Sequence, residues 1–178
     1  MFRTLRWSAV VLGAAALLAS LAPVAQASGP RSRAERAFLT EMVSHHGMAV
    51  DMAKMAQERA THPELKAMAD DIVASQSAEI KRMRSWLRRW YGTSVKPKMN
   101  HEDMMQMEEL QNSASPAEFE VRFMALMTMH HAQAIERAKA VRQRRIHAKT
   151  RKLTRDIIRA QEREIGQMRS WLVAWYAN

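Results

Sequence analysis

The sequence reads FLTEMVSHHGMAVDMAKMAQERATH over residues 38–62 and FMALMTMHHAQAIERAKAVRQRRIH over residues 123–147. These stretches open a longer match in which residues 38–91 align without a gap to residues 123–176. Of the 54 aligned pairs, 21 are identical, and three of the identical pairs are histidines. Self-similarity of this density indicates a duplicated structural unit.

Each copy is predicted to form a helical hairpin. Apolar residues recur at spacings of three and four and do not alternate, which favours helices over strands. Proline suits a first helical turn, so Pro63 predicts a break between helices over about 32–60 and 63–91. The second copy opens with Ser-Pro-Ala-Glu at 115–118, which is a capping box. We expect an all-α four-helix bundle built from two duplicated helical hairpins.

The predicted bundle is one domain over residues 28–178. Repeat one covers 38–91, a linker covers 92–115 and repeat two covers 116–178. The matched Trp-Leu-x-x-Trp-Tyr endings of the second and fourth helices, at 86–91 and 171–176, are expected to close the core.

Polar residues fall on the face of each helix that should point inward. At 100° per residue, the matched residues of the first helix share an arc about 100° wide, which is typical of a core-facing stripe. They are Phe38, Met42, His45, His46, Ala49 and Ala53. The second helix places Gln76, Glu79 and Met83 on the equivalent arc. Burying such polar groups without partners costs about 2–7 kcal/mol each on apolar-transfer scales, so they need partners.

Two explanations account for these inward polar groups. In the first they form a metal site, because Met42 lies three and four residues before two histidines and one helical turn therefore offers sulfur and nitrogen. The chain has no cysteine, and thioether with imidazole favours Cu(I), with Ag(I) as a mimic. The candidate ligands are Met42, His45, His46, Met83, Met127, His130, His131 and Met168, with Gln76, Glu79, Gln161 and Glu164 orienting the imidazoles. In the second, Glu79 bonds His45 or His46 in a metal-free network that sets helix register.

The linker is polar but rich in methionine. It holds Met99, His101, Met104, Met105 and Met107. A polar stretch has no core to fill, so one interpretation is a low-affinity tether that scavenges soft metal ions. The alternative is a short amphipathic connecting helix.

Residues 1–27 are predicted to be a secretory signal. Arg3 and Arg6 precede an apolar stretch over 8–24, and Ala-Gln-Ala at 25–27 is a typical cleavage pattern. We therefore expect a periplasmic or secreted protein after cleavage near Ala27, and not an integral membrane protein.

A run of positive charge lies in repeat two. Residues 137–155 contain nine Lys and Arg and no acid. Such a run is typical of a solvated face, and otherwise of contact with anionic lipid or surface polyanions. Because the chain is predicted to be exported, nucleic acid is not an expected partner.

The motif Met-x-x-His-His-x-x-Ala-(Val/Ile)-(Asp/Glu), followed by Ile-x-x-x-Gln-x-x-Glu-Ile-x-x-Met-x-x-Trp-Leu, occurs in both copies. It resembles the bacterial family called domain of unknown function 305, which is ferritin-like and includes a periplasmic copper-binding protein. The resemblance implies copper binding and metal tolerance in the periplasm, with the metal ion and other periplasmic copper-handling proteins as partners. Gln133 and Arg137 stand where repeat one has Met48 and Met52, so we expect the two halves to differ in metal affinity.

A ferritin-like di-iron enzyme is a further possibility to weigh. Such sites use Glu-x-x-His on two helices, and the sequence contains no Glu-x-x-His. We therefore expect a binding protein that sequesters or ferries Cu(I), not an enzyme. The alternative is a metal-free envelope stress or interaction module with a buried His-Glu-Gln network.

Overall fold

A computed structural model of the chain describes residues 30–177, so the predicted signal segment lies outside the described residues. The described part contains helices and no strand. The helices are α1 (Pro30–Arg59), α2 (Pro63–Tyr91), α3 (His101–Gln111), α4 (Pro116–Arg142) and α5 (Ala148–Tyr176). None of these helices is long and apolar enough to cross a membrane.

Local sequence explains where the helices begin and end. Pro63 occupies the first turn of α2, and Gly92 ends that helix with φ of 60°, a left-handed conformation that glycine adopts without a steric penalty. Ser115 starts α4, since its hydroxyl accepts a hydrogen bond from the Glu118 N–H at 3.1 Å. The proline-marked break and the Ser115 cap are therefore confirmed, whereas the Glu118 carboxylate accepts from the Ala114 N–H at 2.7 Å and not from the Ser115 N–H that a reciprocal capping box uses.

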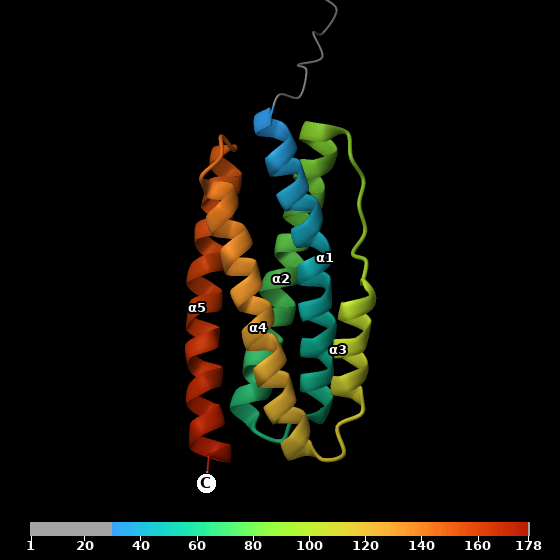
Figure 1. The fold of residues 1–178 in the computed structure, drawn as a ribbon, viewed down its shortest axis with the longest axis vertical. Coiled ribbons are helices and arrows are strands. Elements are labelled where there is room, and N and C mark those ends of the chain that lie inside the picture. Colours follow the sequence, from blue (N-terminus) through green and yellow to red (C-terminus); the bar gives the residue numbers. More distant parts are fainter. Residues whose placement is uncertain (1–29, 178) are drawn as a thin grey trace, which may run out of the picture.

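The two repeats form antiparallel hairpins that meet along α1 and α4 (Figure 1). α1 packs on α2 within repeat one, and α4 packs on α5 within repeat two. α1 and α4 run in opposite directions at the centre of the bundle (Figure 1). The inward faces of these two central helices therefore meet near the middle of the molecule.

Two hydrophobic clusters fill the interior, and each draws on both repeats. Met42 and Met83 of repeat one share a cluster with Ala134 and Ala138 of repeat two. The other cluster reverses this arrangement and combines Met127 and Met168 with Ala49 and Ala53. Matched residues thus occupy matched places on opposite sides of the centre.

The linker contains a helix that packs against the bundle. Asn100 and Asp103 form a reciprocal capping box that begins α3. Leu110 is fully buried, and Met107 packs against the core. This is the connecting helix that the sequence analysis considered as the alternative to a tether, and it makes five helices in the described residues where four were expected.

At each end of the bundle, a buried glutamate of one repeat accepts hydrogen bonds from the turn between the two helices of the other repeat. At one end Glu120 of α4 accepts hydrogen bonds from the Thr61 N–H, the Thr61 hydroxyl, the His62 N–H and the Tyr176 hydroxyl. The Nδ1 atom of His62 lies 2.5 Å from Glu120 Oε2. The glutamate thereby satisfies backbone donors at the start of α2, whose N-terminal N–H groups have no partner within the helix.

Glu35 makes the corresponding junction at the other end. It accepts from the His147 N–H at 3.1 Å, from the Tyr91 hydroxyl at 2.8 Å and from the Thr150 hydroxyl. The ring of Trp90 stacks on His147 with centroids 4.2 Å apart, as Trp175 stacks on His62 at 3.8 Å. The aromatic helix endings therefore close opposite ends of the core.

Candidate metal site

The centre of the bundle holds a pair of histidines, one from each repeat. His45 lies on α1 and His130 on α4, with ring centroids 3.6 Å apart and ring planes tilted by 37°. The rings meet because α1 and α4 cross the centre in opposite directions and carry the matched histidine at the same level. The two repeats thus build one shared centre instead of two remote ones.

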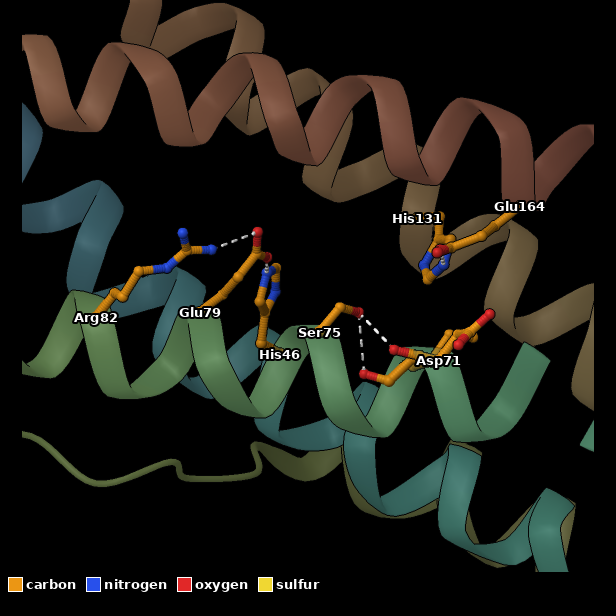
Figure 2. Close-up of polar contacts among 8 residues, drawn as sticks. His46, Asp71, Ser75, Glu79, Arg82, His131 and Glu164 are labelled. Atoms are coloured by element: carbon orange, nitrogen blue, oxygen red, sulfur yellow. Dashed lines mark hydrogen bonds and ion pairs between the residues drawn. The ribbon is translucent and has the colours of Figure 1, made fainter. Parts of the chain in front are cut away.

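The second histidine of each repeat is held by a glutamate of the same repeat (Figure 2). His46 Nε2 lies 2.8 Å from Glu79 Oε2, and His131 Nε2 lies 2.6 Å from Glu164 Oε2. Arg82 adds a longer contact of 3.4 Å to the other oxygen of Glu79. His46 and His131 are fully buried, so the two carboxylates fix the orientation of their rings.

Several buried ring nitrogens have no hydrogen-bond partner. Both nitrogens of His45 and both nitrogens of His130 are unpartnered, as is Nδ1 of His46 and of His131. A buried polar atom left unpaired costs about 1–3 kcal/mol. The expected network is therefore present only at the outer histidines, and the central pair is left with four free nitrogen atoms.

The amides do not complete the network either. The Oε1 atoms of Gln76 and Gln161 are buried without a hydrogen-bond partner. The interpretation in which these glutamines fill in the polar contacts of the histidines is therefore not supported by the geometry.

The central imidazoles are neutral at ordinary pH. Burial, and after it the charges of His46 and Arg137, lower the pKa of His45 to about 3. Burial, followed by the charge of His45, holds the pKa of His130 well below its usual range. Neutral imidazole is the form that binds metal ions through its lone pair.

A cavity of about 580 Å³ opens beside the central pair. Its walls come from α1, α4, the start of α3 and the segment of the linker that precedes α3. The lining residues are Thr40, Glu41, Ser44, His45, Lys98, Met99, Asn100, Glu102, Asp103, Gln106, His130, Gln133 and Arg137. The cavity therefore connects both central histidines with a thioether of the linker.

The linker wall is attached to α1 at two points. The Lys98 N–H donates to the Ser44 hydroxyl at 3.2 Å. A Cβ atom at Gly47 would lie 2.6 Å from Cβ of Pro97, so only glycine permits the linker to approach this closely. The aligned residue in repeat two is Ala132, which is exposed.

The predicted methionine ligands fall into two groups. Met42, Met83, Met127 and Met168 are completely buried. Their thioethers belong to the two hydrophobic clusters, one helical turn along the chain from a histidine or from its glutamate partner.

The linker candidates are dispersed. Only Met99 lines the central cavity. His101, Met104 and Met105 are exposed on α3, the two methionines by 51% and 58%, and Met107 packs against the core. The linker donors therefore lie apart, one beside the central histidines and the others along α3.

The donor set at the centre suits a soft ion. No group of three or more His, Cys, Asp or Glu residues in the described part of the chain is arranged to hold a metal ion. Beside His45 and His130 the cavity is lined by Met99, and methionine sulfur is a ligand that favours Cu(I) over hard cations.

Three features of this region were missed at the sequence level. Glu35 and Glu120 are themselves an aligned pair, and extending the alignment three residues toward the N-terminus would have revealed them. The sequence placed Arg137 opposite Met52 and within the basic run 137–155, but gave no sign that it lines the cavity. The linker's contact with α1 had one sequence signal, the glycine at 47.

The fold and the site define a class of duplicated helical bundle with a buried histidine centre. The domain-of-unknown-function family DUF305 matches residues 35–119 and 120–178, and the chain belongs to this family. The expectation drawn from the repeated motif is thereby confirmed.

Solved structures of similar proteins agree with this assignment. CopM in the Cu(I)-bound form is 34% identical, with a TM-score of 0.72 over 80% of this chain and 98% of that chain. CopM in the Ag-bound form obtained by co-crystallization is also 34% identical, with a TM-score of 0.71 over 80% of this chain and 98% of that chain. A putative secreted DUF305 protein from Streptomyces coelicolor is 27% identical, with a TM-score of 0.70 over 79% of this chain and 91% of that chain.

Among curated proteins, the uncharacterized protein L153 of Acanthamoeba polyphaga mimivirus is 40% identical over 53 residues. This match spans 30% of the present chain and 35% of the relative's length.

Proposed function

We propose that this protein is an extracytoplasmic copper-binding protein that takes up Cu(I) at the centre of the bundle and sequesters or ferries it. The observation that carries the proposal is the pair of touching, neutral imidazoles, whose four nitrogens have no hydrogen-bond partner and which line a cavity. A metal ion would bind the lone-pair nitrogen of each neutral ring, whereas a purely structural role leaves these lone pairs without a partner.

The sulfur ligands come from residues one turn away and from the linker. Met42 and Met127 lie three residues before His45 and His130, and Met99 lies in the cavity wall. The similar protein CopM has been solved in Cu(I)-, Cu(II)- and Ag-bound forms, which supports a soft metal as the ligand of this chain. Nothing in the donor set requires turnover, so we propose binding and not catalysis.

The site of action rests on the predicted signal at 1–27. A secreted relative of the same family supports export, and we propose the periplasm or the extracellular space as the location. Delivery to another periplasmic copper-handling protein is part of the same proposal.

The metal-free alternative draws on the outer histidines. The contacts of His46 with Glu79 and of His131 with Glu164 are those of a network that sets helix register. The same network leaves the central pair unpartnered, and for that reason we favour the metal site.

A competition titration tests the proposal. Protein comprising residues 28–178 would be titrated with Cu(I) against a chelator, with Ag(I) and Zn(II) in parallel. We expect tight binding of the two soft ions and weak binding of Zn(II). In the double variant His45→Ala, His130→Ala, the Cu(I) affinity should fall at least about 100-fold, because removing even an indirect support of a metal site costs 10–100-fold.

The matched control removes linker donors that lie outside the cavity. Met104→Leu with Met105→Leu should lower the total capacity and leave the tight affinity unchanged. Thermal unfolding with and without Cu(I) reports binding independently, because a ligand at about 1,000 times its Kd stabilises the fold by about 4 kcal/mol. Unchanged affinity and stoichiometry in the histidine variant would remove the basis of the proposal.

A further inference from the structure

One end of the bundle is strongly basic. It contains residues 137–155, with nine Lys and Arg and no acid, together with Arg33 and Arg36 of α1 and Arg88 and Arg89 of α2. The start of α1, the end of α2, the end of α4 and the start of α5 all lie there (Figure 1). We call this region the basic end. Segments 57–71 and 108–122 at the opposite end hold eight acids and three basic residues.

The positive charge is specific to repeat two. In repeat one the aligned segment 52–70 holds three basic residues and three acids. Both segments form the same helix–turn–helix corner and bury the same face. The fold therefore does not require the charge, which has accumulated on one copy only.

Little of this charge is neutralised within the protein. Lys139 pairs with Glu136 at 3.1 Å, and Lys152 pairs with Asp156 at 2.7 Å. No ion pair is found within the described residues for the other seven basic side chains of 137–155. Arg144, Arg145, Lys149 and Arg155 are among these seven and are exposed. A cationic surface without internal partners attracts anions from outside.

Several hydrogen-bond donors line a hollow within the basic end. It has a volume of about 310 Å³ and is lined by Lys139, Arg142, Gln143 and Arg151. Arg151 is held in place because it donates to the carbonyl oxygens of Arg142 at 3.1 Å and Arg144 at 3.3 Å. The Nε atom of Arg142 is buried and has no hydrogen-bond partner. A phosphate group offers the acceptors that these guanidinium groups lack.

The chain enters the bundle at the same end. α1 begins at Pro30, and the apolar stretch of the predicted signal ends at Val24. The connecting segment spans at most about 20 Å when fully extended. A signal held in the bilayer during export would therefore bring the basic end, and not the opposite end, close to the membrane surface.

We propose that the basic end docks this protein on membranes containing anionic phospholipid, with a headgroup phosphate in the hollow formed by Arg142 and Arg151. Juxtamembrane clusters of Lys and Arg bind anionic bilayers in this way, and the attraction falls off within a Debye length. The inference does not depend on copper, because the basic end and the histidine centre share no proposed ligand.

Vesicle sedimentation tests the proposal. Both hydrophobic clusters lie within residues 30–177, so a chain of residues 28–178 contains the whole bundle. It should bind vesicles that contain phosphatidylglycerol, should not bind vesicles of phosphatidylcholine alone, and should be released by salt. Inorganic phosphate at millimolar concentration should compete poorly with the vesicles.

Variants of equal charge locate the binding surface. The triple variant Arg145→Ala, Lys149→Ala, Arg155→Ala should weaken vesicle binding about 100-fold, because each basic residue near an anionic surface contributes about fivefold. The control triple Lys54→Ala, Lys81→Ala, Arg169→Ala removes the same charge from exposed positions outside the basic end and should bind within about threefold of the parent.

Orientation can be read directly, because the sequence contains no cysteine. An environment-sensitive dye attached to an Ala148→Cys variant at the basic end should respond to anionic vesicles. The same dye on an Ala114→Cys variant at the opposite end should not respond.

Three results would overturn the proposal. The first is no binding to anionic vesicles at low salt. The second is an equal loss in both triple variants, which would mean that only the net charge matters. The third is binding to polyglutamate or to free phosphate without binding to vesicles, which would identify an acidic protein or a small anion as the ligand.

Discussion

At the turn between α1 and α2, residues 57–63 carry one acid and one basic residue, whereas at the aligned turn of repeat two residues 142–148 carry three arginines and no acid. The interiors next to these turns are far more alike. Glu35 and Glu120 occupy aligned positions, and each contacts the backbone N–H and the ring of an aligned histidine and the hydroxyl of an aligned tyrosine. After duplication, the surface residues of the two copies diverged while the cross-repeat contacts were kept.

The reason lies in how the repeats depend on each other. Each glutamate satisfies donors that belong to the other hairpin, and His45 packs against its copy His130 at the centre. A change at one of these positions affects both hairpins at once, since a buried donor is left unpaired. A change at an exposed turn usually alters stability by less than about 0.5 kcal/mol.

The largest expected effect follows from removing the end junctions. Glu120→Ala should destabilise the fold by about 3 kcal/mol, because buried donors at the start of α2 would lose their acceptor. Glu35→Ala should have a similar effect at the other end. Urea unfolding measures both, with the exposed Glu109→Ala as the control. A loss below about 0.5 kcal/mol in either variant would break the proposed equivalence of the two ends.

The junction at Glu120 should also respond to pH. Burial by itself raises the pKa of Glu120, but hydrogen bonds from Tyr176, His62 and Thr61 together lower it from 4.5 to about 2. Because the pKa is lower in the folded state, the stabilisation is complete above pH 4.5 and is lost as the pH falls toward 2. The stability difference between the parent and Glu120→Gln should therefore shrink across this range, whereas that for Glu109→Gln should stay constant. A difference that does not change with pH would contradict the assigned hydrogen bonds.

An intermediate effect is expected where the segment that precedes α3 packs against α1 at Gly47. Gly47→Ala would place a Cβ atom 2.6 Å from the rigid ring of Pro97. We expect a net loss of about 1 kcal/mol or more and faster proteolysis within 92–100, although alanine favours a helix over glycine by about 1 kcal/mol. The matched change Ala132→Gly lies on an exposed face and should cost only its helix propensity. A Gly47→Ala variant as stable as the parent, with an unchanged cleavage rate, would mean that the linker is not held against α1.

The smallest predicted effect tests the difference between the halves near the centre. Arg137 lines the cavity beside His45, at the position aligned with Met52. Arg137→Met removes a positive charge that opposes a bound cation and adds a soft ligand, so the Cu(I) affinity should rise about fivefold. Arg137→Gln separates the two causes, since it removes the charge alone. An affinity that falls in both variants would show that Arg137 supports the site.

Much of the fold could be predicted because the sequence contains two copies of the same helical hairpin. Helix periodicity, Pro63 and the capping box at Ser115 are local signals, and the elements they predict are present with nearly the expected bounds. Helix geometry also predicted that Glu79 bonds either His45 or His46, because the glutamate lies on the inward stripe of the adjacent helix, and in the structure the partner is His46. Which of the four central histidines contact each other and which bond a glutamate could not be predicted, because this depends on which helices of different hairpins are neighbours.

The sequence by itself determined the duplication, the all-helical class and the set of inward residues, because these depend on spacing along one chain and recur in both copies. Only the tertiary structure decided that His45 meets His130 at one shared centre, that Met99 lines its cavity and that Arg33, Arg36, Arg88 and Arg89 lie at the same end as the basic run of repeat two. Each of these contacts joins segments far apart in the chain. Their positions are set by packing α1 against α4 and by the path of the linker, and no local pattern records that packing.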